Sequence, residues 1–353
     1  MVSGLVYGCG GGNVIFKRNL QVLRVIFGEN NVVLYNIEKS VSQYSTAKGF
    51  YERCFYNYTN GLNSIVVDEI SAISESFDYI WFDNSCYGAL AKKIKQRGYK
   101  GHIITFFHNI EFIFQKRNWL QKILYVIYNR PIKMSEKLSA KYSDLVFVLN
   151  RRDCNIVKQY FPYNKIQILP SSLNDVFIKP SIITKASKER HLNILFVGTN
   201  FYANRNGLLW FIDNIMPISD VHLTIVGKGM DNIPFPKSDK LKVFGFVDSL
   251  CPFYHNCDVV IAPIFEGSGM KTKTTEALMW GKYIIGTPEA FCGFDIDDNQ
   301  GISCQTKEDF INAIEFIRKK GIPSFVKSSR DLFLEKYSIR SSVEIVKKEF
   351  DRF

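Results

Sequence analysis

The sequence has no long hydrophobic run, no closely paired cysteines and few histidines. A membrane-spanning helix needs about 20 apolar residues, and the longest apolar stretches of this chain are much shorter. The eight cysteines include no Cys-x-x-Cys pair, and the five histidines are not spaced as metal ligands. The chain does not open with the basic segment and apolar core of a secretory signal. We therefore expect a reduced, cytoplasmic protein without a structural zinc site.

The residues that are present are those of a globular protein. Of 353 residues, 46% are hydrophobic and 22% are charged, which excludes wholesale disorder and predicts two domains. The net charge of +11 is unevenly divided: residues 1–175 contain 22 basic and 13 acidic residues, and residues 176–353 contain 23 and 21. A basic first half favours phosphates or an anionic membrane surface as partners. No nucleic-acid-binding motif accompanies the charge, so we expect no nucleic-acid partner.

Short β-rich runs alternate with helical stretches along the whole chain. In the first half we expect strands at 5–7, 31–35, 79–82, 103–107 and 145–149, and helices at 14–27, 84–97 and 116–142. In the second half we expect strands at 194–197, 223–226, 243–244, 259–262 and 283–285, and helices at 206–215 and 272–280. This alternation predicts an α/β fold with two doubly wound, Rossmann-like domains facing across a cleft. The polar segment 180–190 is the expected linker between them.

The helical segment 116–142 is both basic and aromatic. Such a helix can lie on a membrane surface, or it can pack on the first sheet as an ordinary helix. The sequence leaves both interpretations open.

The most informative stretch is residues 262–281. It contains the run Gly267-Ser268-Gly269-Met270-Lys271-Thr272-Lys273, followed by Glu276. The pattern predicts a strand, a glycine turn and a helix that begins near Met270. Unpaired N–H groups and the dipole at such a helix start attract an anion, and the glycines let a phosphate approach the backbone.

The charged residues of this stretch extend the argument. Lys271 and Lys273 add positive charge beside the helix start. Glu276 follows Lys273 by three residues, so both lie on one helix face, and a carboxylate there can accept hydrogen bonds from a ribose diol. We therefore predict a nucleotide-sugar site with the diphosphate at the helix start.

These residues resemble the donor-site motif of retaining GT-B glycosyltransferases, the large family 4 and its relatives. Further stretches are similar to the same family in chain order, at 107–111, 144–150, 168–170, 196–198 and 223–229. The resemblance is strong over 191–293 and weaker before residue 100. It implies a GT-B fold with three parts: an N-terminal acceptor-binding domain (1–180), a C-terminal donor-binding domain (181–330) and a C-terminal helix (331–353) that crosses back to the first domain.

The resemblance also implies roles for individual residues. His108 matches a histidine placed near the donor sugar and is expected to be catalytic, with Lys271 and Lys273 stabilising the leaving diphosphate. Glu276 matches the carboxylate that binds the nucleotide ribose. The other donor-binding candidates are Gly10, Gly11, Gly12, Gly198, Arg205, Lys228, Glu266, Ser268, Gly269, Met270 and Thr272.

The sequence departs from the family at two places. Ser268 stands eight residues before Glu276, where the family's Glu-x7-Glu motif has its first Glu, and Glu266 is the candidate substitute. Arg205 is the nearest basic residue after the strand at 194–197, where the family frequently has Arg and Lys.

The implied reaction is transfer of a sugar from a UDP- or GDP-linked donor, with retention of configuration. The acceptor is the hydroxyl of a glycan or of a polyprenyl-diphosphate-linked oligosaccharide, in bacterial surface polysaccharide synthesis such as lipopolysaccharide or capsule. We expect no catalytic base, cofactor or required metal, and interpret Asp295-Ile296-Asp297 as solvated surface. A peripheral association with the anionic inner membrane face would fit the basic first half.

Two alternatives stay open. One is a non-catalytic homologue that binds nucleotide sugars and supports a partner enzyme. The other is a nucleotide-sugar epimerase or hydrolase. A dinucleotide-binding oxidoreductase is disfavoured, because Gly8-x-Gly10-x-x-Asn13 lacks the third glycine of that fingerprint.

Overall fold

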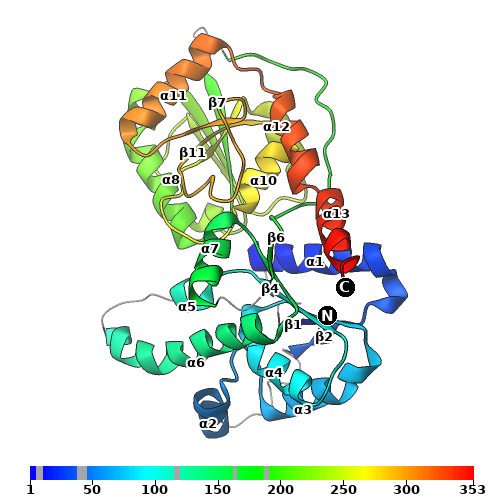
Figure 1. Cartoon of the computed structure of the whole chain (residues 1–353). Helices are drawn as coiled ribbons and strands as arrows, with labels where there is room; N and C mark the ends of the chain where they lie inside the picture. Colours follow the sequence, from blue (N-terminus) through cyan, green and yellow to red (C-terminus); the bar gives the residue numbers. More distant parts are fainter. Residues whose placement is uncertain (5–10, 38–45, 115–119, 162–164, 187–190) are drawn as a thin grey trace. The chain divides into compact units, whose positions relative to one another are not determined.

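The computed structural model describes residues 1–4, 11–37, 46–114, 120–161, 165–186 and 191–353. The chain forms two compact units, one made of Met1–Pro170 with Ser342–Phe353 and the other of Ser171–Ser341. Each unit contains a parallel sheet of six described strands with flanking helices (Figure 1). The predicted α/β class with two doubly wound, Rossmann-like domains is confirmed.

The first unit has the strand order β2-β1-β3-β4-β5-β6. Its strands are β1 (Val2–Ser3), β2 (Tyr35–Asn36), β3 (Tyr79–Phe82), β4 (His102–Phe107), β5 (Leu145–Val148) and β6 (Ile166–Ile168). Its helices are α1 (Gly11–Phe27), α2 (Thr46–Tyr56), α3 (Ser64–Ile73), α4 (Gly88–Gln96), α5 (Glu111–Phe114), α6 (Leu120–Tyr142), α7 (Arg151–Tyr160) and most of α13 (Ile339–Phe350). Because β2 and β3 flank β1, the direction of strand addition reverses between β1 and β3.

The second unit has the strand order β12-β11-β10-β7-β8-β9. Its strands are β7 (Leu192–Val197), β8 (Val221–Val226), β9 (Leu241–Phe244), β10 (Val259–Ala262), β11 (Tyr283–Gly286) and β12 (Gly301–Ser303). Its helices are α8 (Tyr202–Asn214), α9 (Cys251–Asn256), α10 (Thr272–Met279), α11 (Lys307–Lys320) and α12 (Lys327–Leu332). Here the direction of strand addition reverses between β7 and β10.

Local sequence explains why these elements form. The central strands β10 and β11 are buried along their whole length, which is why they are continuous apolar runs rather than alternating ones. Side-chain caps set several helix starts: Asn150 accepts from the Asp153 amide at α7, and Thr306 forms a capping box with Asp309 at α11. Gly321, at a φ of 65°, ends α11.

Aromatic packing and an ion pair explain why residues 342–353 belong to the first unit. The ring of Phe350 lies 5.4 Å from that of Phe27 and 4.9 Å from that of Tyr79, between centroids. Glu349, on the same helix, forms an ion pair with Lys165.

The segment 171–180, which the sequence analysis assigned to the first domain, lies with the second unit. The Leu173 amide donates to the Tyr337 carbonyl at 3.0 Å, and the Ile339 amide donates to the Leu173 carbonyl at 3.1 Å. Asp175 forms an ion pair with Arg330. These contacts join the segment to the second unit before the polar stretch that was expected to be the linker.

Several expected elements differ in extent. The region 31–35 is a strand only at its end, because residues 29–31 form a 3₁₀ turn after Gly28. The helix expected at 84–97 begins at Gly88, since Asn84 instead caps the short 3₁₀ turn Ser85–Tyr87. The helix expected at 331–353 is interrupted at Ser338, whose backbone is extended. The strand expected at 5–7 lies outside the described residues.

The described half of α6 packs against α4. A Cβ on Gly88 would lie 2.0 Å from the Ser135 carbonyl oxygen, so only glycine permits this approach. The hydroxyls of Ser135 and Ser139 donate to the Cys86 and Ser85 carbonyls, both at 2.6 Å. For residues 129–142 the packed-helix interpretation is therefore correct. Within the described ranges, no helix is long and apolar enough to cross a membrane.

Candidate functional site

The predicted donor residues around Gly198 and in the run 267–273 lie at the reversal point of the second sheet. In open α/β sheets, ligands bind beyond the carboxyl ends of the strands at the point where strand order reverses. The segments that follow β7 and β10 meet at this point, since these strands are neighbours. They carry Gly198 and the run 267–273.

The turns that follow β7 and β8 approach each other closely at Gly198 and Gly227. Gly227 has a φ of 157°, and a Cβ placed on it would lie 1.9 Å from the Gly198 carbonyl oxygen. The Asn200 amide donates to the Lys228 carbonyl at 3.0 Å, which joins the same turns. The backbones of the two turns are therefore in direct contact, with no side chain between them. Lys228, in the second turn, is exposed.

The turn before α10 is built on Gly267 and Gly269, at φ values of 143° and 62°. The helix begins at Thr272, slightly later than predicted, and the side chain of its N-cap residue, Lys271, makes no capping hydrogen bond. An uncapped helix start leaves backbone N–H groups for an anion.

Lys271 is turned back onto this turn. Its Nζ donates to the carbonyls of Ser268 at 3.1 Å and Gly269 at 3.0 Å, and forms an ion pair with Glu289 at 2.7 Å. Its charge is therefore partly neutralised, and in this arrangement Lys271 holds the turn rather than standing open to a ligand.

Lys273 connects α10 to α8 across the reversal point. Its buried Nζ donates to Asn204 Oδ1 at 2.5 Å and lies 4.8 Å from the centroid of the Phe196 ring. Asn204 is oriented in turn by a bond from its Nδ2 to the Thr199 carbonyl at 2.8 Å. Burial, and after it the charge of Lys271, lower the pKa of Lys273 to about 7, against the opposing effect of Glu276.

Glu276 lies one turn further along α10 and is half-buried. Its Oε2 accepts from the hydroxyl of Tyr254 at 3.4 Å, and Tyr254 stacks on Trp280 with centroids 5.4 Å apart. Burial raises the pKa of Glu276 to about 7, against the opposing effects of Lys273 and of the Tyr254 hydrogen bond. A cation and a carboxylate with pKa values near neutrality thus share one helix.

The remaining candidates of the second unit take different positions. Met270 is buried, and its Sδ accepts from the Ser171 amide at 3.3 Å, so it packs the turn from within. Glu266 is exposed and accepts from Asn206 Nδ2 at 3.2 Å, and Arg205 is exposed on α8. Ser268 and Thr272 are half-buried in the turn and the first position of α10.

The first-unit candidates are only partly described. Gly10 lies outside the described residues, and Gly11 and Gly12 form the start of α1. His108 follows β4 and is 9% exposed, with Nε2 at 3.1 Å from Oδ2 of Asp83, which is fully buried.

Sequence reasoning missed five residues: Asn204, Tyr254, Glu289 and Asp83, which the contacts above include, and Arg18, which is buried on α1 and interacts electrostatically with Asp83. Arg18 alone had a readable signal, because it interrupts the apolar face of α1 between Ile15 and Val22. The other four are brought in by tertiary packing from separate elements. No group of three or more potential metal ligands exists among the residues that the structure describes.

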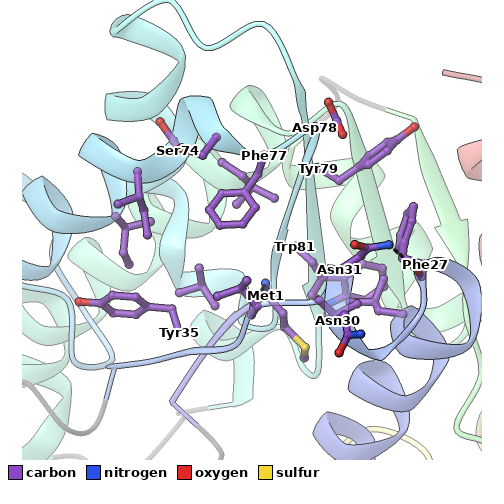
Figure 2. A pocket seen from close by; sticks show the side chains of 18 of the residues that line it. Met1, Phe27, Asn30, Asn31, Tyr35, Ser74, Phe77, Asp78, Tyr79 and Trp81 are labelled. Carbon is purple, nitrogen blue, oxygen red and sulfur yellow. Dashed lines mark hydrogen bonds between the residues drawn. The ribbon is translucent and has the colours of Figure 1, made fainter.

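A cavity of about 550 Å³ lies elsewhere in the first unit, beside the amino ends of β1, β2 and β3. Figure 2 shows Met1, Tyr35, Phe77 and Tyr79 around it, with Phe27 and Asn31 at one side. Its walls are mostly aromatic and aliphatic, and it contains none of the predicted site residues.

Comparisons with known proteins agree with this architecture. Residues 191–319 match the family model described as Glycosyl transferases group 1. No curated protein sequence matches the chain. Among solved structures, the chain is similar to the lipopolysaccharide outer core galactosyltransferase WaaB in its apo form, with a TM-score of 0.68 and 12% identity over 100% of this chain and 99% of WaaB.

Two further solved structures are similar along nearly the whole chain. HepE of Anabaena in complex with UDP-glucose has a TM-score of 0.64 and 12% identity, covering 100% of this chain and 98% of HepE. A glycosyltransferase from Rickettsia africae has a TM-score of 0.63 and 13% identity, covering 99% and 97%. The chain therefore has the GT-B fold, and the match to the glycosyl transferase family model falls within its second unit.

Proposed function

We propose that this protein transfers a sugar from a nucleoside diphosphate sugar, UDP- or GDP-linked, to a hydroxyl of a glycan or lipid-linked oligosaccharide, with retention of configuration. The observation that carries the proposal is the uncapped start of α10 at the reversal point, with Lys273 and Glu276 on one helix. HepE, a structural neighbour, is known in complex with UDP-glucose, which supports a nucleotide-sugar donor.

In this proposal the α10 start receives the diphosphate. The uncapped N–H groups and the Lys273 ammonium stabilise negative charge as it develops on the leaving group, and this electrostatic support lowers the barrier. Glu276 accepts hydrogen bonds from the ribose diol. Lys271 and Glu289 keep the turn in shape, so the N–H groups need no rearrangement when the donor arrives.

His108 is proposed to face the donor sugar, as the family resemblance implies. Its Nε2 lies 3.1 Å from Oδ2 of Asp83, and this contact orients the imidazole. No protein group is assigned as nucleophile or general base. No metal or other cofactor is assigned either.

We also propose that the first unit associates with an anionic membrane surface at the cytoplasmic face, where a lipid-linked acceptor would be presented. Four aromatic side chains of α2 are exposed: Phe50, Tyr51, Phe55 and Tyr56, with Phe55 at 68%. Exposed aromatic side chains, in a half of the chain where basic residues outnumber acidic ones by 22 to 13, favour the headgroup region of anionic bilayers. Co-sedimentation with anionic but not neutral vesicles, weakened in Phe55→Ser, would support this; equal sedimentation of both proteins would contradict it.

The direct test of the activity is turnover by the purified chain. UDP- and GDP-hexoses are offered with a polyprenyl-diphosphate-linked oligosaccharide, and release of nucleoside diphosphate and the anomeric configuration of the product are followed by NMR. The proposal expects transfer with retention. An inverted product would contradict the retaining mechanism, and donor binding without turnover would favour a non-catalytic partner protein, for which the Ser268 replacement leaves room. Sugar release without acceptor dependence would favour a hydrolase.

A further inference from the structure

The first unit contains a buried arginine that the proposed donor site does not use. Arg18, on α1, is 2% exposed, and none of its three guanidinium nitrogens has a hydrogen-bond partner within the described residues. Burial lowers the pKa of Arg18 to about 9, which still leaves the group charged at neutral pH. A buried cation without hydrogen bonds is costly, so such a group normally has an anionic partner.

Asp83 is the carboxylate whose charge acts on Arg18, but it does not supply the hydrogen bonds that the guanidinium lacks. Asp83 attracts Arg18 electrostatically, but its oxygens are already engaged. Oδ1 accepts from Asn19 Nδ2 at 2.6 Å and from Trp81 Nε1 at 3.3 Å. Oδ2 accepts from Ser3 Oγ at 3.4 Å and lies 3.1 Å from His108 Nε2. The N–H donors of Arg18 are therefore left for another oxyanion.

The guanidinium is held in a way that keeps these donors available. Its Cζ lies 5.1 Å from the centroid of the Phe106 ring, a cation–π contact that uses no N–H group as a hydrogen-bond donor. The N–H groups at its edge remain able to bind two oxygens of a phosphate or carboxylate side by side. His108 packs edge-on against the same ring at 4.9 Å, so Arg18 and His108 are neighbours around Phe106.

The place of this cluster in the fold is that of a ligand site. Ser3 ends β1 and Asp83 directly follows β3, and the two are hydrogen-bonded at the reversal point of the first sheet. Arg18 thus stands at the first-unit equivalent of the position where the second unit carries its donor residues.

We propose that Arg18 binds an oxyanion, a phosphate or carboxylate group, on the acceptor. The assignment to the acceptor rests on the proposed function, in which the first unit binds that substrate. Because only 2% of Arg18 is exposed, the groups that cover the guanidinium must move when the ligand enters. The acceptor is then selected for carrying such a group, and neutral sugars bind poorly.

The test is calorimetric titration of the full chain, first saturated with UDP, with glucose 6-phosphate, glucuronate and glucose. These probes present a phosphate, a carboxylate and neither. We expect at least one anionic sugar to bind tenfold or more tightly than glucose, and Arg18→Lys to remove that advantage by losing the planar fork. Lys17→Gln, an exposed change on the same helix, is the control and should bind like the wild type.

Arg18→Lys keeps the positive charge beside Asp83. If Arg18→Lys folds poorly, Arg18→Gln serves as the second variant. Equal affinities in wild type and either folded variant, or no preference of the wild type for the anionic sugars, would overturn the proposal. Which anionic sugar binds separates a phosphate from a carboxylate acceptor. Failure of the first step, UDP binding, would count against the donor site and not against Arg18, since the sugars can also be titrated alone.

Discussion

Lys273 Nζ, on α10, donates to Asn204 Oδ1, on α8, at 2.5 Å. The two helices follow the two strands between which strand order reverses, so this bond spans the place where an open α/β sheet binds its ligand. The Lys273 amine is buried and has a lowered pKa. An anion that binds beside it would raise this pKa and favour the charged ammonium.

Lys273→Met should weaken binding of UDP or GDP tenfold or more while leaving binding of the bare nucleoside nearly unchanged. The reason is that a hydrogen bond from a charged donor contributes about 1.5–3 kcal/mol, and only the diphosphate can receive it. Calorimetry with the nucleoside diphosphate and the nucleoside measures both. Lys319→Met, an exposed change on α11, is the control. A parallel loss for nucleoside and diphosphate would move the phosphate site elsewhere.

Glu276→Gln should reduce the preference for a ribonucleotide over its 2′-deoxy form. In the wild type the carboxylate accepts from the ribose hydroxyl, and we expect a preference of about tenfold from a charged hydrogen bond. In the variant the ratio should approach one, whereas Glu308→Gln, exposed on α11, should keep it. An unchanged ratio in Glu276→Gln would remove the ribose role.

The pKa values of Glu276 and Lys273 predict opposite slopes of stability with pH. The raised pKa of Glu276 means that the folded chain holds a proton that the unfolded chain releases. The free energy of unfolding that Glu276 contributes therefore decreases as the pH rises from about 4.5 to about 7. The lowered pKa of Lys273 means that the folded chain loses its proton first, so stability rises from about pH 7 to 10.5.

Urea unfolding of the wild type, Glu276→Gln and Lys273→Met across this range tests both slopes. Glu276→Gln should flatten the fall on the acid side, and Lys273→Met should flatten the rise on the alkaline side. Curves of the same shape for all three proteins would show that these groups titrate at ordinary pKa values.

Gly227→Ala should destabilise the second unit by more than 2 kcal/mol, because its Cβ would lie 1.9 Å from the Gly198 carbonyl oxygen. Gly267→Ala serves as the comparison, because it introduces backbone strain without the steric clash. It has a similar φ of 143°, but its nearest neighbour is the flexible Lys271 side chain at 3.5 Å, so we expect about 1 kcal/mol. Denaturant unfolding compares them, and equal losses would mean that φ strain alone matters.

The fold was largely predictable because its signals are local. Strands such as 79–82 and 259–262 are apolar runs bounded by aspartate or proline, and the helix after Gly269 follows from the glycine turn. The boundaries near 31–35 and 84–88 were less predictable, since a 3₁₀ turn and an Asn cap decide them. The segment 171–180 was misplaced because its contacts with residues 330–339 join parts of the chain far apart in sequence.

The candidate site was predictable only in part, for the same physical reason. Lys273 and Glu276 could be placed on one helix face from their spacing alone. Their partners Asn204 and Tyr254 come from α8 and α9, and no local pattern marks them. The sequence also could not tell that Lys271 turns back to Glu289, because that ion pair depends on the loop after β11.

The central claim is that the second unit binds a nucleoside diphosphate at the start of α10. The most direct measurement is the thermal unfolding of the full chain with UDP, GDP, ADP and CMP, in wild type and Lys273→Met. A ligand at 100 times its dissociation constant stabilises the folded state by about 2.7 kcal/mol, which shifts the midpoint by several degrees. We predict a clear shift with UDP or GDP that is lost in Lys273→Met. No shift with any nucleoside diphosphate, or the same shift in both proteins, would contradict the account.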